Sequence, residues 1–277
     1  MGNWFARFLK ANGYKVIITD KNKRTARVLS KKYGFRCLSD QSEAVSRSDI
    51  VILATPTRMT RMILYQAAQF LKPSAVLIEI SSIKRPVLGI IRKLQKNGNA
   101  VMSIHPMFGP GTKTLKGRRI LIVTPPPNRH ARKLLSTFRT NGATITRCTP
   151  KKHDVLISTI LALPHFINIS LVETLKSLNA DLNELNSAAG TTFQLQLLLG
   201  EEIYNEDYDN EISILQNCNR DVMETYDRKT SEIIRMMNAN PSALKRMLKG
   251  GRKFLKTDRQ FASSYARFNA AVQASLP

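Results

Sequence analysis

Short aliphatic runs alternate with longer amphipathic segments through the first half of the chain. The runs are rich in Val, Ile and Thr and predict strands over 15–19, 49–54, 75–80, 99–104, 119–124 and 143–146. The segments between them place apolar residues at helical spacing and predict helices over 3–12, 24–33, 57–70, 84–96 and 129–141. This alternation is typical of an α/β fold, and we predict a Rossmann-like, doubly wound parallel sheet.

The pattern changes after Pro150. Prolines and glycines become rare, and apolar residues at helical spacing predict long helices over 152–178, 191–203, 212–237 and 241–254. We therefore divide the chain into two domains, an α/β domain of residues 1–150 and an all-α domain of residues 151–277.

Charge is distributed as unevenly as the predicted secondary structure. The chain carries 43 Lys and Arg against 20 Asp and Glu, a net charge of +23, and residues 1–150 hold 28 of the basic and only 5 of the acidic side chains. The rest of the chain is neutral. A basic domain attracts anions of many kinds, so charge alone does not distinguish a dinucleotide or a dicarboxylate from a nucleic acid.

Cysteine spacing and hydropathy indicate the cellular compartment in which we expect the protein. Cys37, Cys148 and Cys218 lie far apart with no paired spacing, so we expect neither a disulfide framework nor a metal site. A reducing, cytoplasmic location is the default. We expect no membrane contact, because no apolar run approaches the roughly 20 residues needed to cross a bilayer.

The first residues already predict a helix, whereas a nucleotide-binding domain normally opens with a strand and a G-x-G-x-x-G turn. Gly2 takes the place of the last glycine of that fingerprint, where a helix N-terminus faces the pyrophosphate. We expect the domain to be N-terminally incomplete, without its first strand and part of the glycine-rich loop. Asp20 ends the next strand, where such folds place the acid that binds the adenosine ribose, although a turn role is the alternative. A carboxylate there favours NAD, and the lysines beside it leave NADP possible.

Polar residues follow the strands at 49–54 and 75–80, at the edge where open α/β sheets bind ligands. Thr55 and Pro56 follow the first strand, and Ser81, Ser82 and Lys84 follow the second. Each also has a structural explanation: a turn for the first two, a helix cap for either serine and a solvated position for the lysine. Capping and function are compatible here.

His105 is the strongest candidate for a catalytic residue. It follows the strand at 99–104, is held by Pro106, and lies at the same predicted sheet edge as Ser82. An imidazole titrates near neutrality, so it can take a proton or a hydrogen bond from a substrate hydroxyl as hydride leaves the same carbon. A lone histidine at a strand end is more often structural, and an imidazole turned into a packed interior would contradict the catalytic interpretation.

Three motifs taken together resemble the prephenate and arogenate dehydrogenase family: M-G-N-W-F-A at 1–6, S-S-I-K at 81–84 and H-P-M-F-G-P at 105–110. The resemblance runs through the whole chain and includes K-H-D at 152–154. It implies NAD(P)-dependent oxidative decarboxylation of prephenate to 4-hydroxyphenylpyruvate in tyrosine biosynthesis. It also implies that the helical domain forms a homodimer.

The resemblance implies roles for individual residues. His105 matches the catalytic histidine, and Ser82 matches the serine that orients it and the substrate. Thr55 and Pro56 match the cofactor-lining loop, and we place Ser81 with them. Lys84 is adjacent to the serine motif and is a candidate for attracting a substrate carboxylate.

One position departs from the family pattern. Gln194 stands where many bacterial members have an arginine that grips a substrate carboxylate. A glutamine offers hydrogen bonds without charge, so the preference between prephenate and arogenate stays open. A helix residue with no ligand is the alternative for Gln194.

Two other interpretations stay open. A dehydrogenase acting on arogenate or a related hydroxy acid would keep the fold and change only the substrate. A non-catalytic basic protein with a degenerate nucleotide fold would use its charge on a polyanion. The intact motifs argue against the second, and base-stacking aromatic residues are sparse, so nucleic acid is not the expected partner.

Overall fold

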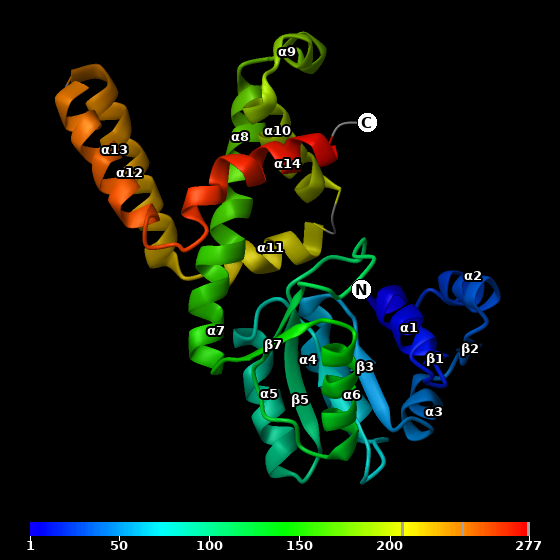
Figure 1. Ribbon diagram of the computed structural model, residues 1–277. Helices are drawn as coiled ribbons and strands as arrows, with labels where there is room; N and C mark the ends of the chain where they lie inside the picture. Colours follow the sequence, from blue (N-terminus) through cyan, green and yellow to red (C-terminus); the bar gives the residue numbers. More distant parts are fainter. Residues whose placement is uncertain (206–207, 240, 276–277) are drawn as a thin grey trace. The chain divides into compact units, whose positions relative to one another are not determined.

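The computed structural model describes residues 1–205, 208–239 and 241–275, and Figure 1 labels its helices and strands. The chain forms two compact units. One comprises Met1–Ile157 with Asp209–Cys218, and the other comprises Ser158–Tyr208 with Asn219–Pro277. The predicted division at residue 150 falls at the first residue of α7 (Pro150–Ile157) and stays a prediction of the domain limits.

A five-stranded sheet lies at the centre of the first unit, in the order β3-β4-β5-β6-β7. A separate two-stranded parallel sheet pairs β1 (Ile17–Ile18) with β2 (Arg36–Cys37). The predicted α/β class is confirmed. The predicted strands do not include β2, because its two residues are too few to show a strand pattern in the sequence. The strands of the larger sheet are β3 (Ile50–Leu53), β4 (Val76–Glu79), β5 (Val101–Pro106), β6 (Arg119–Ile122) and β7 (Thr144–Arg147).

One strand pair departs from the all-parallel sheet that we predicted. β5 and β6 are antiparallel, with His105 opposite Leu121, whereas the other neighbouring pairs are parallel. Residues 107–118 join β5 to β6 without a helix, so the chain turns back beside the strand that it has just left. The end of β5, which carries His105, therefore leads into a loop.

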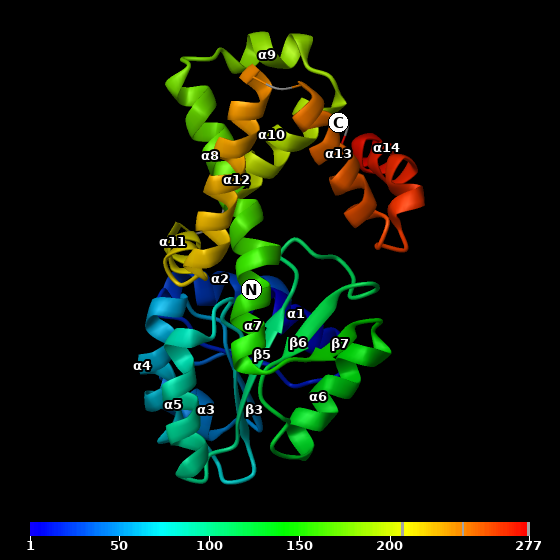
Figure 2. The ribbon, with the colours of Figure 1, turned by 90° about the vertical axis from the view of Figure 1, so that its left-hand side faces the viewer.

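Helices cover both faces of this sheet, and Figure 2 shows α4 and α5 on one side of the strands and α6 on the other. Side chains alternate along β4: Val76 and Ile78 pack with residues of α1 and α6, whereas Leu77 packs with residues of α4 and α5. Burial on both faces explains why this strand is apolar throughout until Glu79. The helices of the first unit are α1 (Gly2–Ala11), α2 (Lys23–Tyr33), α3 (Gln41–Ser46), α4 (Thr57–Ala68), α5 (Arg85–Lys96), α6 (Arg129–Thr140), α7 and α11 (Tyr208–Gln216).

The second unit consists of helices throughout the part of it that the structure describes. α8 and α10 approach closely, since a β-carbon at Gly200 would lie 2.8 Å from Cγ2 of Val172. The single helix predicted over 212–237 is two, α11 and α12, because the chain breaks where Ser158 Oγ accepts the Asn219 amide. The helices of this unit are α8 (Leu163–Ser177), α9 (Leu182–Ala188), α10 (Thr191–Tyr204), α12 (Arg220–Ala239), α13 (Pro241–Leu255) and α14 (Ser264–Ser275), with a 3-10 turn at Phe261–Ser263.

One helix corrects our expectation about membrane-spanning segments. α7, a π-helical turn at Ser158–Ala162 and α8 form a helix over Pro150–Ser177 that is long and apolar enough to cross a membrane. Pro164 and scattered Ser, Thr and Asn residues interrupt the apolar pattern without adding charge, which hid this run. Helices of soluble proteins meet the same criteria of length and composition. Only 22% of its apolar window is buried within the chain, which leaves surface for a partner to cover.

Candidate functional site

Hydroxyl groups link the ends of β3 and β4. Oγ1 of Thr55, after β3, lies 3.2 Å from Oγ1 of Thr60 in α4. The Ser81 hydroxyl, after β4, donates to Thr60 Oγ1 at 3.4 Å, and the Ser81 amide donates to Glu79 Oε2 at 2.9 Å. Pro56 is the N-cap residue of α4. The fold thus brings together Thr55, Pro56 and Ser81, the three loop residues predicted to line a cofactor.

The start of α1 lies at the same edge of the sheet. Gly2 is its first residue, and a β-carbon built there would lie 3.5 Å from Cβ of Ala54, the residue before Thr55. Met1 is the N-cap residue of α1 and makes no side-chain cap hydrogen bond to it. Nucleotide folds hold a pyrophosphate with such an uncapped helix start beside a strand-end loop.

Asp20 follows β1 and is exposed. Its Oδ1 accepts the amide of Asn22 at 2.8 Å, the local turn hydrogen bond that was the alternative to a ligand role. A carboxylate has further acceptor capacity, so this bond is compatible with binding a ribose hydroxyl. The ribose role of Asp20 stays a prediction.

A chain of hydrogen bonds begins at His105. Its Nδ1 lies 3.0 Å from Nε2 of His153, and Nδ1 of His153 lies 2.7 Å from Oδ1 of Asp154. The Asp154 carboxylate also accepts the backbone amides of Lys84 at 3.1 Å and Arg85 at 2.9 Å, at the start of α5. β5 therefore positions the first imidazole, the start of α7 positions the second, and the start of α5 stabilises the carboxylate.

This chain of bonds determines which nitrogen of His105 is basic. Burial acts to raise the pKa of Asp154, but hydrogen bonds from His153 and from the Lys84 and Arg85 amides outweigh it and lower that pKa. An ionised Asp154 only accepts, so it takes the Nδ1–H of His153. A neutral His153 then accepts the Nδ1–H of His105 at Nε2. Nε2 of His105 is left with its lone pair available, and it is the nitrogen that can take a proton.

His105 is buried, and only 4% of its surface is exposed. Burial lowers its pKa well below the usual value, and the positive charge of Lys84 lowers it further, so the imidazole is neutral. Among the described residues, Thr19 Oγ1 is the one buried side-chain nitrogen or oxygen without a hydrogen-bond partner. Within the described residues no hydrogen bond to Nε2 of His105 is found, so no described side chain occupies this nitrogen.

Lys84 lies in the interior, which corrects our expectation that it attracts a substrate carboxylate. Its side chain is fully buried, and its Nζ donates to Glu79 Oε1 at 2.8 Å and to the Ile104 carbonyl at 2.7 Å. Burial lowers the pKa of Lys84, and the Glu79 carboxylate opposes that shift. The Ser103 hydroxyl donates to the same carboxylate. The buried pair therefore joins the ends of β4 and β5 just before His105.

Two further candidates, Ser82 and Gln194, have surroundings that leave their predicted roles open. Ser82 is half-buried in the loop after β4, and within the described residues it is His153, rather than Ser82, that contacts Nδ1 of His105. Gln194 is exposed on α10 of the second unit, with Nε2 3.5 Å from the Ala189 carbonyl. The orienting role of Ser82 and the substrate role of Gln194 stay predictions.

An aromatic contact ties the loop after His105 to the start of α1. The Trp4 ring lies 4.8 Å from the Phe108 ring, and its indole nitrogen donates to the Thr112 carbonyl at 2.7 Å. Trp4 is itself buried in the core of the first unit. The contact holds the loop after β5 against the helix whose start carries Gly2.

Sequence reasoning missed His153, Asp154 and Thr60 as parts of this site. The available signal was the adjacent His-Asp pair in the first turns of the helix after the last predicted strand, where a titratable pair can reach the sheet edge. A metal role has no such support: the described residues contain no group of three or more His, Cys, Asp or Glu side chains placed to hold an ion.

Both parts of the chain match sequence families. Residues 5–145 match the family described as "Prephenate dehydrogenase, nucleotide-binding domain". Residues 149–249 match the family described as "Prephenate dehydrogenase, dimerization domain". The two matches meet near residue 147 and together cover most of the chain.

A curated relative supports the same assignment. The chain is 31% identical over 240 residues to a probable arogenate/prephenate dehydrogenase of Methanocaldococcus jannaschii, which covers 84% of this chain and 53% of that protein. The chain spans about half the length of the curated relatives that it matches.

Solved structures share the fold. Prephenate dehydrogenase from Aquifex aeolicus, in complex with hydroxyphenyl propionate and NAD+, has a TM-score of 0.68 and 17% identity, covering 93% of this chain and 95% of that one. Synechocystis arogenate dehydrogenase has the same TM-score and identity, covering 92% and 95%. At these identities the likeness concerns the fold, an α/β unit followed by helices.

Proposed function

The chain belongs to the prephenate dehydrogenase family, and from that premise we propose that it oxidises prephenate with a nicotinamide dinucleotide as the hydride acceptor. Arogenate is the alternative substrate. The name of the Methanocaldococcus jannaschii relative includes both substrates and so does not separate them.

The hydrogen-bond chain from His105 through His153 to Asp154 is the observation that carries this proposal. It places the proton of the His105 imidazole on Nδ1 and leaves Nε2 as the basic nitrogen, at the end of the strand that the buried Lys84–Glu79 pair joins to β4. A general base must be unprotonated at the working pH and must reach the proton that it removes. The lowered pKa of His105 meets the first requirement, and within the described residues no hydrogen bond occupies Nε2.

In the proposed reaction, Nε2 of His105 accepts the proton of the ring hydroxyl while hydride leaves the carbon that bears it. The alcohol becomes a ring ketone, and the ring carboxylate then leaves as carbon dioxide. The electrons of the broken carbon–carbon bond make the ring aromatic, and the phenolate oxygen takes its proton back from His105. One hydride is transferred, one carbon dioxide is released and no net proton is consumed, so the organic product is 4-hydroxyphenylpyruvate.

A nicotinamide dinucleotide, when bound, supplies the hydride acceptor. The residues of the first unit fit such a group. The uncapped start of α1 at Gly2 would hold the pyrophosphate, and Asp20 would bind the adenosine ribose. Thr55, Pro56 and Ser81 would line the cofactor at the ends of β3 and β4. A carboxylate at Asp20 repels a 2′-phosphate, which favours NAD over NADP.

The four combinations of prephenate or arogenate with NAD+ or NADP+ test this proposal. Absorbance of the reduced cofactor is followed with the purified chain in each mixture. We expect turnover, with the highest kcat/KM for prephenate with NAD+. Faster turnover with arogenate would change the proposed substrate and leave the proposed dehydrogenase activity in place. No turnover in any of the four mixtures would contradict a dehydrogenase activity.

We also propose that the second unit forms a homodimer. The match to a dimerization domain over 149–249 supports this, as does apolar surface that the chain itself leaves open. A stable homodimer buries such surface against a second copy. Sedimentation at micromolar concentration should give twice the chain mass, and a monomer would contradict the proposal. The exposed apolar side chains of this unit include Ile160, Leu178, Leu198, Leu199 and Ile234.

A further inference from the structure

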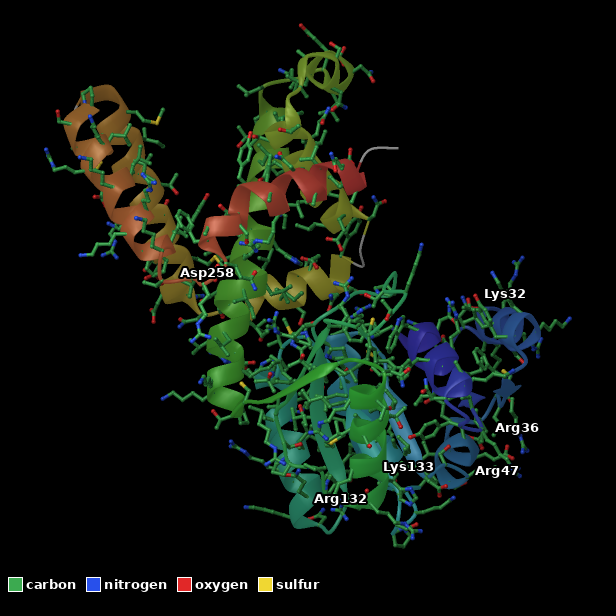
Figure 3. All side chains as sticks on the ribbon, in the orientation of Figure 1. Lys32, Arg36, Arg47, Arg132, Lys133 and Asp258 are labelled. Atoms are coloured by element: carbon green, nitrogen blue, oxygen red, sulfur yellow. The ribbon has the colours of Figure 1, made fainter. Side chains whose placement is uncertain are left out.

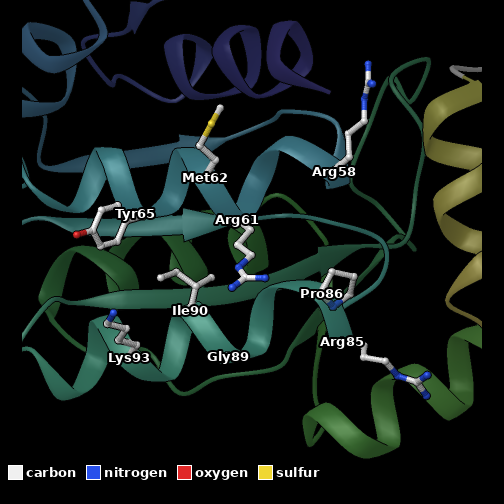
Figure 4. A pocket seen from close by; sticks show the side chains of 9 residues that line it. All are labelled: Arg58, Arg61, Met62, Tyr65, Arg85, Pro86, Gly89, Ile90 and Lys93. Atoms are coloured by element: carbon white, nitrogen blue, oxygen red, sulfur yellow. The ribbon is translucent and has the colours of Figure 1, made fainter.

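A groove lies on the outer face of the first unit, between α4 and α5. This groove has a volume of about 840 Å³, and Figure 4 shows the side chains that line it. Four residues of α4 and four of the five from α5 have the spacing i, i+3, i+4 and i+7, so one face of each helix builds one wall. The lining residues are Arg58, Arg61, Met62 and Tyr65 on α4, and Arg85, Pro86, Gly89, Ile90 and Lys93 on α5.

The groove carries more positive charge than the described residues neutralise. Arg58 pairs with Asp209 at 2.6 Å. No carboxylate in the described part of the chain pairs with the side chains of Arg61, Arg85 or Lys93. Three cations thus face one groove without a counter-charge from the residues that the structure describes, and an anion of several charges would neutralise them.

Tyr65 adds an aromatic surface to the α4 wall of the groove. The Tyr65 side chain is 49% exposed, with the Lys93 ammonium 5.9 Å from its ring centre. Figure 4 shows the Arg61 guanidinium directed from α4 toward α5. Nothing lies within 4 Å of a β-carbon built at Gly89, so the absence of a side chain there keeps this wall open.

We propose that this groove binds a nucleoside polyphosphate, with its phosphates on Arg61 and Lys93 and its base on Tyr65. Guanidinium groups match phosphate oxygens in pairs, and an exposed tyrosine ring stacks on any base. The seven-residue span of each wall is about 10 Å long, and the volume lies in the range of small-ligand sites. A small dicarboxylate offers fewer charges and no base, which makes it a poorer fit.

The positive charge of the first unit as a whole favours such a ligand as well. Basic side chains from separate elements cover the first unit, including Lys32, Arg36, Arg47, Arg132 and Lys133 in Figure 3. A field of one sign raises the local concentration of polyanions and their rate of association. The groove shares only Arg85 with the hydrogen-bond chain of His105, through the Arg85 backbone amide, and the substitutions below leave that residue unchanged.

Calorimetric titration of the full chain with ATP and with inorganic tripolyphosphate tests the proposal. Tripolyphosphate has no adenosine and so cannot be drawn to the proposed ribose contact of Asp20. We expect both probes to bind, and Arg61→Glu to weaken both by about 10-fold or more, the effect of losing a charge-assisted bond. Tyr65→Ala should weaken ATP by about 5-fold or more and leave tripolyphosphate unchanged.

Two further variants separate the groove from charge and folding effects. Arg132→Glu makes the same charge change on α6, across the sheet, and should weaken both probes far less than Arg61→Glu. Gly89→Leu adds no charge, meets no neighbour at its β-carbon and fills the groove, so it should abolish ATP binding while the chain stays folded. Each of these variants should form reduced cofactor from prephenate at the wild-type rate, which separates failure here from failure of the proposed function.

Three results would overturn the proposal. One is equal weakening by Arg61→Glu and Arg132→Glu, and another is no binding of either probe at millimolar concentration. The third is an oligouridylate that binds more than about 10-fold tighter than ATP with a steep salt dependence, which would assign the surface to nucleic acid.

Discussion

Nδ1 of His105 lies 3.0 Å from Nε2 of His153, and this contact joins the end of β5 to the first turns of α7. The two residues are 48 positions apart in the sequence. Asp154 holds the second imidazole in turn, so the protonation of the first is set by a carboxylate that it does not touch. We regard His153 as a positioning residue for the proposed base.

The role of His153 can be tested with two substitutions. His153→Gln keeps an acceptor for the Nδ1–H of His105, whereas His153→Leu removes it. We expect the leucine variant to lose about 10-fold or more in kcat and the glutamine variant to lose less. Only the leucine variant removes the acceptor that holds the proton of His105 on Nδ1. Kinetics across a pH series, with thermal unfolding of both variants, would check this. Equal losses in kcat together with equal losses in stability would indicate a structural role alone.

The buried, neutral state of His105 predicts a pH dependence of stability. Above its ordinary pKa of about 6.5 neither the folded nor the unfolded chain binds a proton at this residue. Below that value the unfolded chain binds one and the folded chain, whose pKa is lowered, does not. As the pH drops below about 6.5, the free energy of unfolding should therefore decrease. The decrease is up to about 1.4 kcal/mol per pH unit and continues until the pH reaches the pKa of His105 in the folded chain.

Urea unfolding of the wild type and His105→Asn at about pH 7.5 and 5.5 measures this effect. The asparagine variant should lose about 1.4 kcal/mol less than the wild type between the two conditions, since the other titrating groups are common to both. An unchanged pH dependence in the variant would show that His105 is not held neutral by the fold. His130→Asn, at a half-buried position on α6, serves as the matched control.

The buried pair of Lys84 and Glu79 predicts a non-additive pair of substitutions. Glu79→Leu leaves the Lys84 ammonium buried without its counter-charge and should cost about 3–5 kcal/mol of stability. The double variant Glu79→Leu/Lys84→Met removes both charges and should be at least about 2 kcal/mol more stable than the single one. Urea unfolding measures both free energies. Losses that simply add would argue that the two charges do not interact.

The strand ends of the site could be predicted from the sequence, because buried strands are apolar runs whose first polar residues lie at the sheet edge. Thr55, Ser81 and His105 follow three such runs, and their positions needed only the strand pattern. The reversal of β6 was not visible in this way, since strand direction depends on whether a connection packs a helix.

The partners of these residues depended on tertiary contacts that the sequence pattern does not encode. His153 reaches His105 only because α7 starts beside the end of β5. Lys84 looked like a surface lysine at a helix start, and its burial follows from the Glu79 carboxylate and the Ile104 carbonyl that receive its ammonium. Gln194 lies in the other unit, where pattern reasoning gives a helix face and no ligand.

The turnover of His105→Asn with prephenate tests the central claim most directly. The variant and the wild type are compared for formation of reduced cofactor, and NAD+ affinity is measured for both by calorimetry. Loss of the proton acceptor should reduce kcat by at least about 100-fold while NAD+ affinity stays unchanged. A variant that turns over prephenate at close to the wild-type rate would contradict the assignment of His105 as the base.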